Sequence, residues 1–190
     1  MIDASAHDFA TNISMTAEVS DFCHALGNIS VEGELGTVAG VEDEVVVKQG
    51  KELLCSADQA VEFVERSRID LFAPAIGTAH GLYKSENPFV DFERLDQINR
   101  LINGSGVRVP LVVHGGTGLA PDVVKKLVSL GGAKFNVSTD LKHTWINSID
   151  DYLSENKSDY NTGKLDSIAK DAIRAKIKSW ITLLGSDHKA

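Results

Sequence analysis

The sequence predicts an α/β protein with a parallel sheet, because short β-rich runs alternate with helical patterns along the chain. The β-rich runs are nearly continuous apolar stretches, which is typical of parallel strands covered on both faces. Strands are expected at 29–36, 70–77, 109–116 and 133–139, with a strand stub at 1–5. Helices are expected at 9–26, 57–66, 92–102 and 121–130, and two more helical stretches follow at 141–153 and 165–184.

Several of the expected helices have recognisable ends. Ser56 and Gln59 have the spacing of a capping box, and Pro121 suits a first-turn position, where its missing N–H costs nothing. Gly27 and Gly131 stand where left-handed helix terminators belong. The long, acidic segment 37–54 is interpreted as a mobile loop between a strand and a helix.

The alternation of elements is compatible with two architectures. A (β/α)8 barrel typically needs ~250 residues and eight strands, whereas this chain has 190 residues, four expected strands and a stub. A doubly wound open sheet fits the length, and the pattern alone does not choose between them. We expect a single domain over residues 1–190, with a helical extension over about 141–190.

Composition restricts the class of partner. The net charge of −8 argues against nonspecific binding to nucleic acid or to an anionic membrane, since both require a basic face. No apolar run approaches the ~20 residues of a membrane-spanning helix. The two cysteines, Cys23 and Cys55, lack metal-ligand spacing and suit a reducing, cytoplasmic location.

Two histidines stand at equivalent places in the predicted sheet. His80 and His114 each follow a strand and each precede a glycine. In parallel α/β folds, sites form at the carboxyl ends of the strands, and neutral imidazoles converging there suit zinc. The alternative for either ring is a hydrogen-bonded structural histidine. The other four histidines are assigned no ligand role.

Glycine-rich and hydroxyl-rich turns lie at the same strand ends. The segment HGGTG, from His114 to Gly118, allows a close approach of the backbone to a ligand. The segment NVSTD, from Asn136 to Asp140, opens a helix and offers N–H groups to an anion. The alternative is that these residues are turn and helix caps.

Carboxylates also occur near the strand ends. Glu32 and Glu34 share one face of a strand, and a buried position there requires a cation or hydrogen-bond donors. Asp3 ends the strand stub in a similar way. Glu42 lies on the acidic loop, either as a solvated charge or as a general acid/base that moves over a site.

Taken together, MIDAS, VEGELG, AIGTAHGLYK, LVVHGGTGL and KFNVSTDLK resemble the class II, zinc-dependent fructose- and tagatose-bisphosphate aldolases along the whole chain. The resemblance implies a partial TIM barrel, strands four to eight of a (β/α)8 fold. It also implies an aldehyde-lyase of carbohydrate metabolism. Such enzymes cleave a ketose 1,6-bisphosphate reversibly to dihydroxyacetone phosphate and an aldehyde, and are usually homo-oligomers.

The resemblance also implies roles for individual residues. His80 and His114 match two of three ligands of the catalytic Zn²⁺, and Asp3 and Glu34 match ligands of a second divalent or monovalent cation. Glu42 aligns with a loop acid/base. The positions that match those holding dihydroxyacetone phosphate are Gly81, Gly115, Gly116, Thr117, Asn136, Val137, Ser138 and Thr139.

The family's third zinc histidine and its catalytic aspartate precede the matched region, so we expect this chain alone to be weakly active or inactive. One alternative is a subunit of a split aldolase. Another is a non-catalytic relic that binds phosphate or a partner chain. A third, a different phosphosugar isomerase or epimerase, is disfavoured because a metal-free isomerase needs neither His-Gly motif.

Overall fold

A computed structural model describes residues 1–27, 29–37, 39–42, 45–47, 54–81, 83, 88–104 and 108–189. Their contacts divide the chain into two compact units, Met1–Asn136 and Val137–Ala190. Both helices expected for the C-terminal extension lie in the second unit. The single domain over 1–190 stays a prediction.

The first unit contains a parallel sheet, as predicted. Its order is β1 (Glu32–Leu35), β4 (Leu71–Pro74), β6 (Leu111–Val113) and β7 (Gly132–Phe135). The expected stub is a single parallel bridge, in which the Ile2 N–H donates to the Glu32 carbonyl at 2.9 Å. The strands are shorter than predicted but lie within or next to the expected ranges.

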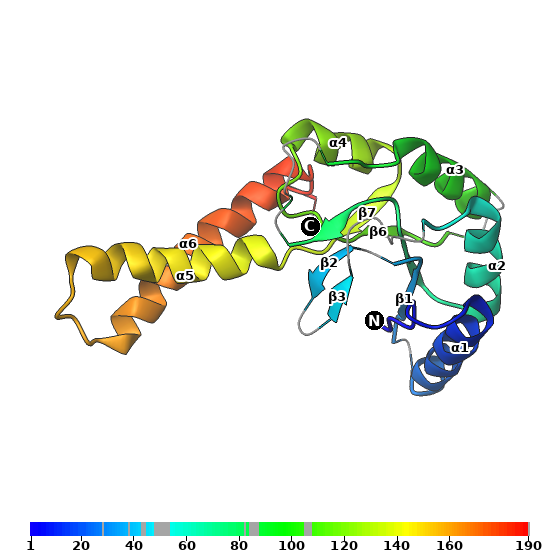
Figure 1. Cartoon of the computed structure of the whole chain (residues 1–190), viewed down its shortest axis with the longest axis horizontal. Helices are drawn as coiled ribbons and strands as arrows, with labels where there is room; N and C mark the ends of the chain where they lie inside the picture. Colours follow the sequence, from blue (N-terminus) through cyan, green and yellow to red (C-terminus); the bar gives the residue numbers. More distant parts are fainter. Residues whose placement is uncertain are drawn as a thin grey trace. The chain divides into compact units, whose positions relative to one another are not determined.

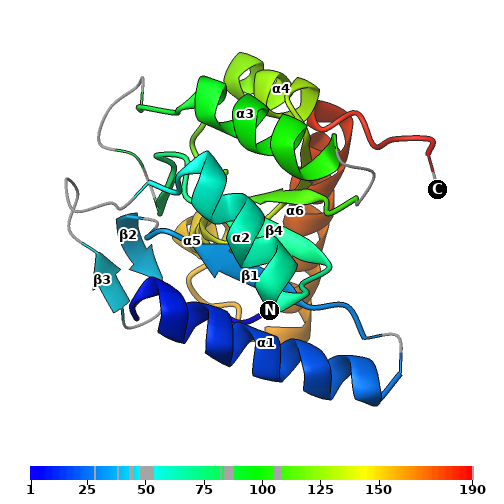
Figure 2. The same ribbon diagram turned by 90° about the vertical axis from the view of Figure 1, so that its right-hand side faces the viewer.

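Four helices cover one face of this sheet (Figures 1 and 2). They are α1 (Phe9–Ala25), α2 (Ala57–Ser67), α3 (Phe92–Asn103) and α4 (Pro121–Ser129). Neighbouring helices contact one another, α1 with α2, α2 with α3, and α3 with α4. The α/β fold with consecutive strand–helix steps is therefore confirmed, and it is the architecture of part of a TIM barrel.

The helix ends follow the predicted chemistry. Ser56 precedes α2, and its hydroxyl accepts from the Gln59 N–H at 3.2 Å. Pro121 occupies the first position of α4. Gly27 and Gly131 follow α1 and α4 with φ of +123° and +108°, values that glycine adopts without strain.

The interpretation of 37–54 as a loop was wrong for its described part. That part forms two short antiparallel strands, β2 (Ala39–Glu42) and β3 (Val45–Val47). Strand β2 also pairs in parallel with β5 (Ala79–His80). Residues 38, 43–44 and 48–53 lie outside the described residues. Strands of three or four residues contain too short a pattern for local composition to predict them.

The expectation that every strand is covered on both faces was wrong for β7. Gly132 is buried, but Ala133 and Lys134 are exposed. The other three strands of the sheet are almost entirely buried. Lys134 is the charged residue of β7.

Helix α1 packs a largely polar face against the sheet. Asn12, Thr16 and Ser20 are buried, and the Thr16 hydroxyl donates to the Asn12 side chain at 3.1 Å. A Cβ at Gly33 would lie only 3.0 Å from side-chain atoms of Thr16 and Ile69. Gly33 therefore faces the helices. By alternation, its neighbours Glu32 and Glu34 face the other side of the sheet.

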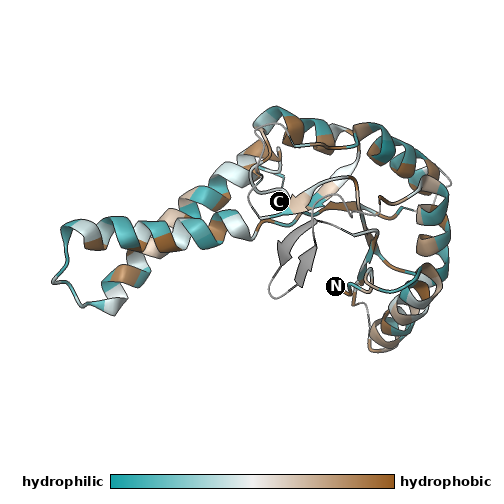
Figure 3. Cartoon of the chain, in the orientation of Figure 1, coloured by the Kyte–Doolittle hydropathy of each residue, from teal (hydrophilic) through white to brown (hydrophobic). Residues whose placement is uncertain are grey.

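The second unit is an antiparallel pair of helices, α5 (Thr139–Glu155) and α6 (Thr162–Leu183). A hydrogen bond joins the two helices: the Trp180 indole N–H on α6 donates to the Asp140 carboxylate on α5 at 2.8 Å. Hydrophobic and hydrophilic residues intermingle along both helices (Figure 3). Among the described helices, none is long and apolar enough to cross a membrane.

Replacement of Gly33 by alanine tests this packing. The new methyl group must displace the side chains of Thr16 on α1 and Ile69 before β4, which already lie 3.0 Å away. We expect Gly33→Ala to lower the free energy of unfolding by about 1–3 kcal/mol. Urea unfolding followed by circular dichroism measures the change.

Gly163→Ala is the matched control, because its Cβ would have no neighbour nearer than 3.5 Å. Alanine also favours the helix that begins there, so we expect no loss of stability. Equal stability of the Gly33→Ala variant and wild type would contradict the packing of α1 on β1.

Candidate functional site

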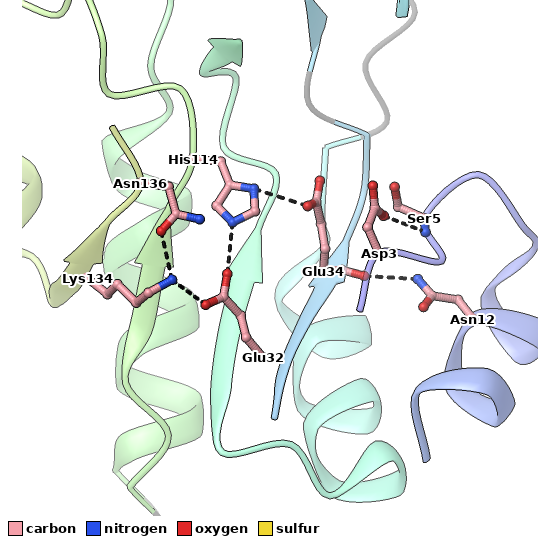
Figure 4. Close-up of polar contacts among 8 residues, drawn as sticks. All are labelled: Asp3, Ser5, Asn12, Glu32, Glu34, His114, Lys134 and Asn136. Carbon is pink, nitrogen blue, oxygen red and sulfur yellow. Dashed lines mark hydrogen bonds and ion pairs between the residues drawn. The ribbon is translucent and has the colours of Figure 1, made fainter. Parts of the chain in front are cut away.

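Charged and polar side chains from three strands meet on the sheet face opposite the helices (Figure 4). His114 directly follows β6, Glu32 and Glu34 lie on β1, and Lys134 lies on β7. His114, Glu32 and Glu34 are exposed by only 3%, 5% and 2%. Buried charges require compensating partners, and these residues supply them to one another.

The shorter of the two contacts made by the histidine joins it to Glu32. His114 Nε2 lies 3.0 Å from Glu32 Oε1. An ionised carboxylate only accepts hydrogen bonds, so Nε2 carries the hydrogen and donates it. In the neutral imidazole the lone pair then resides on Nδ1.

The other ring nitrogen faces the second glutamate. His114 Nδ1 lies 3.1 Å from Glu34 Oε2, in an ion-pair contact that is not an aligned hydrogen bond. Glu34 is held in place through its main chain, because the buried Asn12 side chain donates to its carbonyl at 3.0 Å. The imidazole therefore lies between two carboxylates.

These contacts shift the ionisation of both groups. Burial alone would lower the pKa of His114, but its contacts with Glu32 and Glu34 outweigh burial and raise the pKa to about 9. Burial alone would raise the pKa of Glu32, but hydrogen bonds from His114 and Lys134 prevail and lower the pKa to about 2. At neutral pH the polypeptide by itself holds an imidazolium between carboxylates.

Lys134 extends this network toward the end of β7. Its Nζ donates to Glu32 Oε2 at 2.5 Å and to Asn136 Oδ1 at 2.7 Å. Since an ammonium only donates, the Asn136 oxygen must face the lysine and the NH₂ group must point elsewhere. A continuous polar chain thus runs from His114 through Glu32 and Lys134 to Asn136 (Figure 4).

The two histidines predicted to act together do approach each other. The ring centroids of His80 and His114 are 5.6 Å apart, with an interplanar angle of 34°. Zinc prefers imidazole nitrogen, and a ligand histidine commonly donates its other N–H to a carboxylate. The Nε2–H bond to Glu32 fits that second requirement, so the pair suits two positions of a zinc site.

The rest of such a site is not provided by the described part of the chain. There, no three histidine, cysteine, aspartate or glutamate side chains are arranged to hold a metal ion together. Asp3, expected beside Glu34 in a second cation site, accepts a hydrogen bond from the Ser5 N–H at its Oδ1, at 2.9 Å. The donor set therefore fits zinc in part, with two imidazoles.

Tyr83 joins the two His-Gly turns. Its hydroxyl accepts from the Ala79 N–H at 2.9 Å and donates to the Gly115 carbonyl at 2.7 Å. A Cβ at Gly115, where φ is +69°, would come within 2.4 Å of the Ala79 carbonyl oxygen. Gly115 is thus required for the close approach of the turns that carry His80 and His114.

The remaining predicted anion-binding residues are distributed along the chain as follows. Gly81 follows β5, and a Cβ there would meet nothing within 4 Å, so its backbone borders open space. Gly116 and Thr117 are buried in the turn after His114. Asn136 closes the first unit, whereas Val137, Ser138 and Thr139 begin the second, with Ser138 at the N-cap of α5. Glu42 ends β2.

Sequence reasoning did not identify Lys134 or Tyr83 as parts of the site. Lys134 stands in KFN, two residues before Asn136, on the same strand face by alternation. That spacing is a usable signal once Asn136 is a candidate. No local signal identifies Tyr83, whose role depends on contacts with two separate turns.

Comparisons with known proteins identify the family of the chain and structures with a similar fold. A family model described as fructose-bisphosphate aldolase class-II matches residues 1–189. The YdjI aldolase from Escherichia coli K12 is 38% identical, with a TM-score of 0.78 over 99% of this chain and 61% of its own.

Two other crystal structures are similar. One, from Coccidioides immitis, is titled as a candidate fructose-1,6-biphosphate aldolase; it is 28% identical, with a TM-score of 0.84 over 100% of this chain and 63% of its own. Fructose-bisphosphate aldolase from Campylobacter jejuni, 20% identical, shares the fold with a TM-score of 0.76 over 96% of this chain and 59% of its own. The chain thus spans about three fifths of these proteins.

Removal of the Tyr83 hydroxyl tests the link between the turns. Tyr83→Phe leaves a part-buried N–H and carbonyl without the hydroxyl that they contact. We expect a loss of about 1–3 kcal/mol in the free energy of unfolding. Tyr160→Phe is the control, because Tyr160 is 87% exposed. If the two variants unfold at the same urea concentration, the link contributes nothing.

The raised pKa of His114 predicts a pH-dependent contribution to stability. A folded-state pKa of about 9 against an ordinary value of 6.5 gives stabilisation that is complete below pH 6.5 and is lost as the pH rises through 9. The difference in unfolding free energy between metal-free wild type and His114→Gln should therefore shrink from pH 6 to pH 10. A constant difference would show that no proton is bound more tightly in the folded chain.

Proposed function

Because the chain belongs to the class II fructose-bisphosphate aldolase family, we propose that it acts as an aldehyde-lyase of carbohydrate metabolism. The reaction is the reversible cleavage of a ketose 1,6-bisphosphate to dihydroxyacetone phosphate and an aldehyde. The convergence of His80, on β5, and His114, directly after β6, with ring centroids 5.6 Å apart, is the observation that carries this proposal.

His80 and His114 are the proposed ligands of a zinc ion. The hydrogen bond from His114 Nε2 to Glu32 leaves Nδ1 as the nitrogen with a lone pair, on the side of the ring that faces Glu34. When bound, zinc supplies a Lewis acid that withdraws electron density from substrate oxygens while the C3–C4 bond breaks. Glu34, with Asp3, is proposed to hold a second divalent or monovalent cation.

The substrate phosphate is proposed to bind at backbone N–H groups of the glycine-rich turns. Gly81 supports this role, since its backbone borders open space next to His80. The further residues proposed to hold dihydroxyacetone phosphate are Gly115, Gly116, Thr117, Asn136, Val137, Ser138 and Thr139. Contacts remote from the breaking bond orient it relative to the catalytic groups, and Glu42 is the proposed loop acid/base.

A complete site requires more than this chain is seen to supply. The described residues offer two imidazoles, and the chain spans about three fifths of the structures it matches. We therefore propose low activity for the 190 residues alone, and completion by further polypeptide within a homo-oligomeric enzyme.

The free cysteines Cys23 and Cys55 support a cytoplasmic location. The absence of a three-ligand cluster from the described residues favours the alternative, a non-catalytic phosphate- or partner-binding chain.

Metal and activity measurements test the proposed function. We expect the chain to bind Zn²⁺, and expect His80→Ala and His114→Ala to weaken binding at least tenfold, because each removes one of few ligands. His188→Ala, near the C-terminus, is the control. Isothermal titration in Zn²⁺-buffered solution gives the affinities.

Cleavage of fructose and tagatose 1,6-bisphosphates is then measured as the rate at which dihydroxyacetone phosphate is released. The assay is run with the chain alone and with the portion of the Escherichia coli relative that this chain does not match. We expect the second mixture to be the more active. If no zinc binds and no cleavage occurs in either mixture, the lyase function is rejected and the non-catalytic alternative is favoured.

A further inference from the structure

We propose that Lys134 is a positioning residue. It orients the His114 imidazole indirectly, through Glu32, and it orients the Asn136 amide by a direct hydrogen bond. This inference rests on the proposed function for its significance, but not for its geometry. One ammonium group would thereby fix the orientation of both the proposed metal ligand His114 and the proposed substrate-binding amide of Asn136.

Glu32 is buried between a histidine and a lysine. Its side chain is only 6% exposed, and each carboxylate oxygen has a different cationic or polar partner. Oε1 accepts from His114 Nε2 at 3.0 Å, and Oε2 accepts from Lys134 Nζ at 2.5 Å. The lysine fixes the plane of the carboxylate, and the carboxylate in turn fixes the imidazole ring.

One ring nitrogen of His114 is left for a ligand. As long as Glu32 remains an ionised acceptor, the hydrogen of neutral His114 stays on Nε2 and the lone pair stays on Nδ1. Without the lysine, the carboxylate would lose a charge-assisted hydrogen bond and its fixed orientation. Carboxylates that accept from metal-bound histidines determine tautomer and ring orientation in this way.

Lys134 also contacts Asn136. Lys134 Nζ lies 2.7 Å from the Asn136 side-chain oxygen, and lysine cannot accept a hydrogen bond. The Asn136 NH₂ group is therefore turned away from the lysine and left to donate to another acceptor. Glu32, Lys134 and Asn136 all belong to the first unit, so this arrangement does not depend on the second.

Lys134→Met tests the proposal, since methionine has similar length but no charge and no donor. We expect Zn²⁺ to bind ~10–100-fold more weakly, the usual effect of removing a group that supports a metal ligand. Lys125→Met is the matched control, because Lys125 is exposed on α4 in the same unit. Circular dichroism verifies that both variants fold.

A double variant tests whether the effect passes through Glu32. In a Glu32→Gln background the neutral amide needs no cationic partner, so adding Lys134→Met should change Zn²⁺ affinity less than twofold. An equal loss in both backgrounds would overturn the proposal, as would wild-type affinity in Lys134→Met.

Nuclear magnetic resonance of the zinc-free chain supplies a readout that is independent of metal and of catalysis. The His114 Nε2–H proton should exchange slowly in wild type and Lys125→Met, and rapidly in Lys134→Met, where the Asn136 NH₂ signals should also shift. Unchanged signals would overturn the proposal. A wild-type chain that binds no zinc would count against the lyase, while this measurement would still decide the role of Lys134.

Discussion

The burial of two carboxylates on one strand is the constraint on which the rest of the site depends. Glu32 and Glu34 alternate with Gly33, whose lack of a side chain lets α1 and α2 pack against the back of β1. Both glutamates must therefore point to the opposite face, where solvent does not reach them. An isolated buried charge costs several kcal/mol or more, so a cation has to be placed between them.

The protein meets this requirement with residues from two neighbouring strands. His114 at the end of β6 contacts both glutamates, and Lys134 on β7 contacts Glu32. The same contacts that neutralise the carboxylates also fix the imidazole, which stands 5.6 Å from His80 in centroid distance. Charge compensation and ligand orientation are thus achieved by one set of interactions.

Sequence alone predicted the order of strands and helices, because apolar runs, caps and glycines act locally. Ser56, Pro121 and Gly131 each have the role expected of them. Sequence also predicted that His80 and His114 approach each other, since parallel strands align their carboxyl ends. The ring centroids are 5.6 Å apart, but His80 belongs to β5, which pairs with β2 rather than with a strand of the four-stranded sheet. The metal and phosphate roles of these residues were expected from the family resemblance, and they remain proposals.

What the sequence did not predict depends on contacts between distant segments. The pairing of β2 with β5 and the exposure of β7 follow from tertiary neighbours rather than composition. The Tyr83 hydroxyl donates to a carbonyl 32 residues away, and Lys134 donates to a glutamate 102 residues away. Hydrogen bonds between residues so far apart in the sequence leave no periodic pattern from which they could be predicted.

X-ray absorption at the zinc edge of the loaded chain shows whether His80 and His114 bind the same metal ion. We expect one site with two imidazole nitrogens at about 2.0–2.1 Å, and one imidazole fewer after His80→Ala. A spectrum without histidine scattering, or one that His80→Ala leaves unchanged, would contradict this expectation.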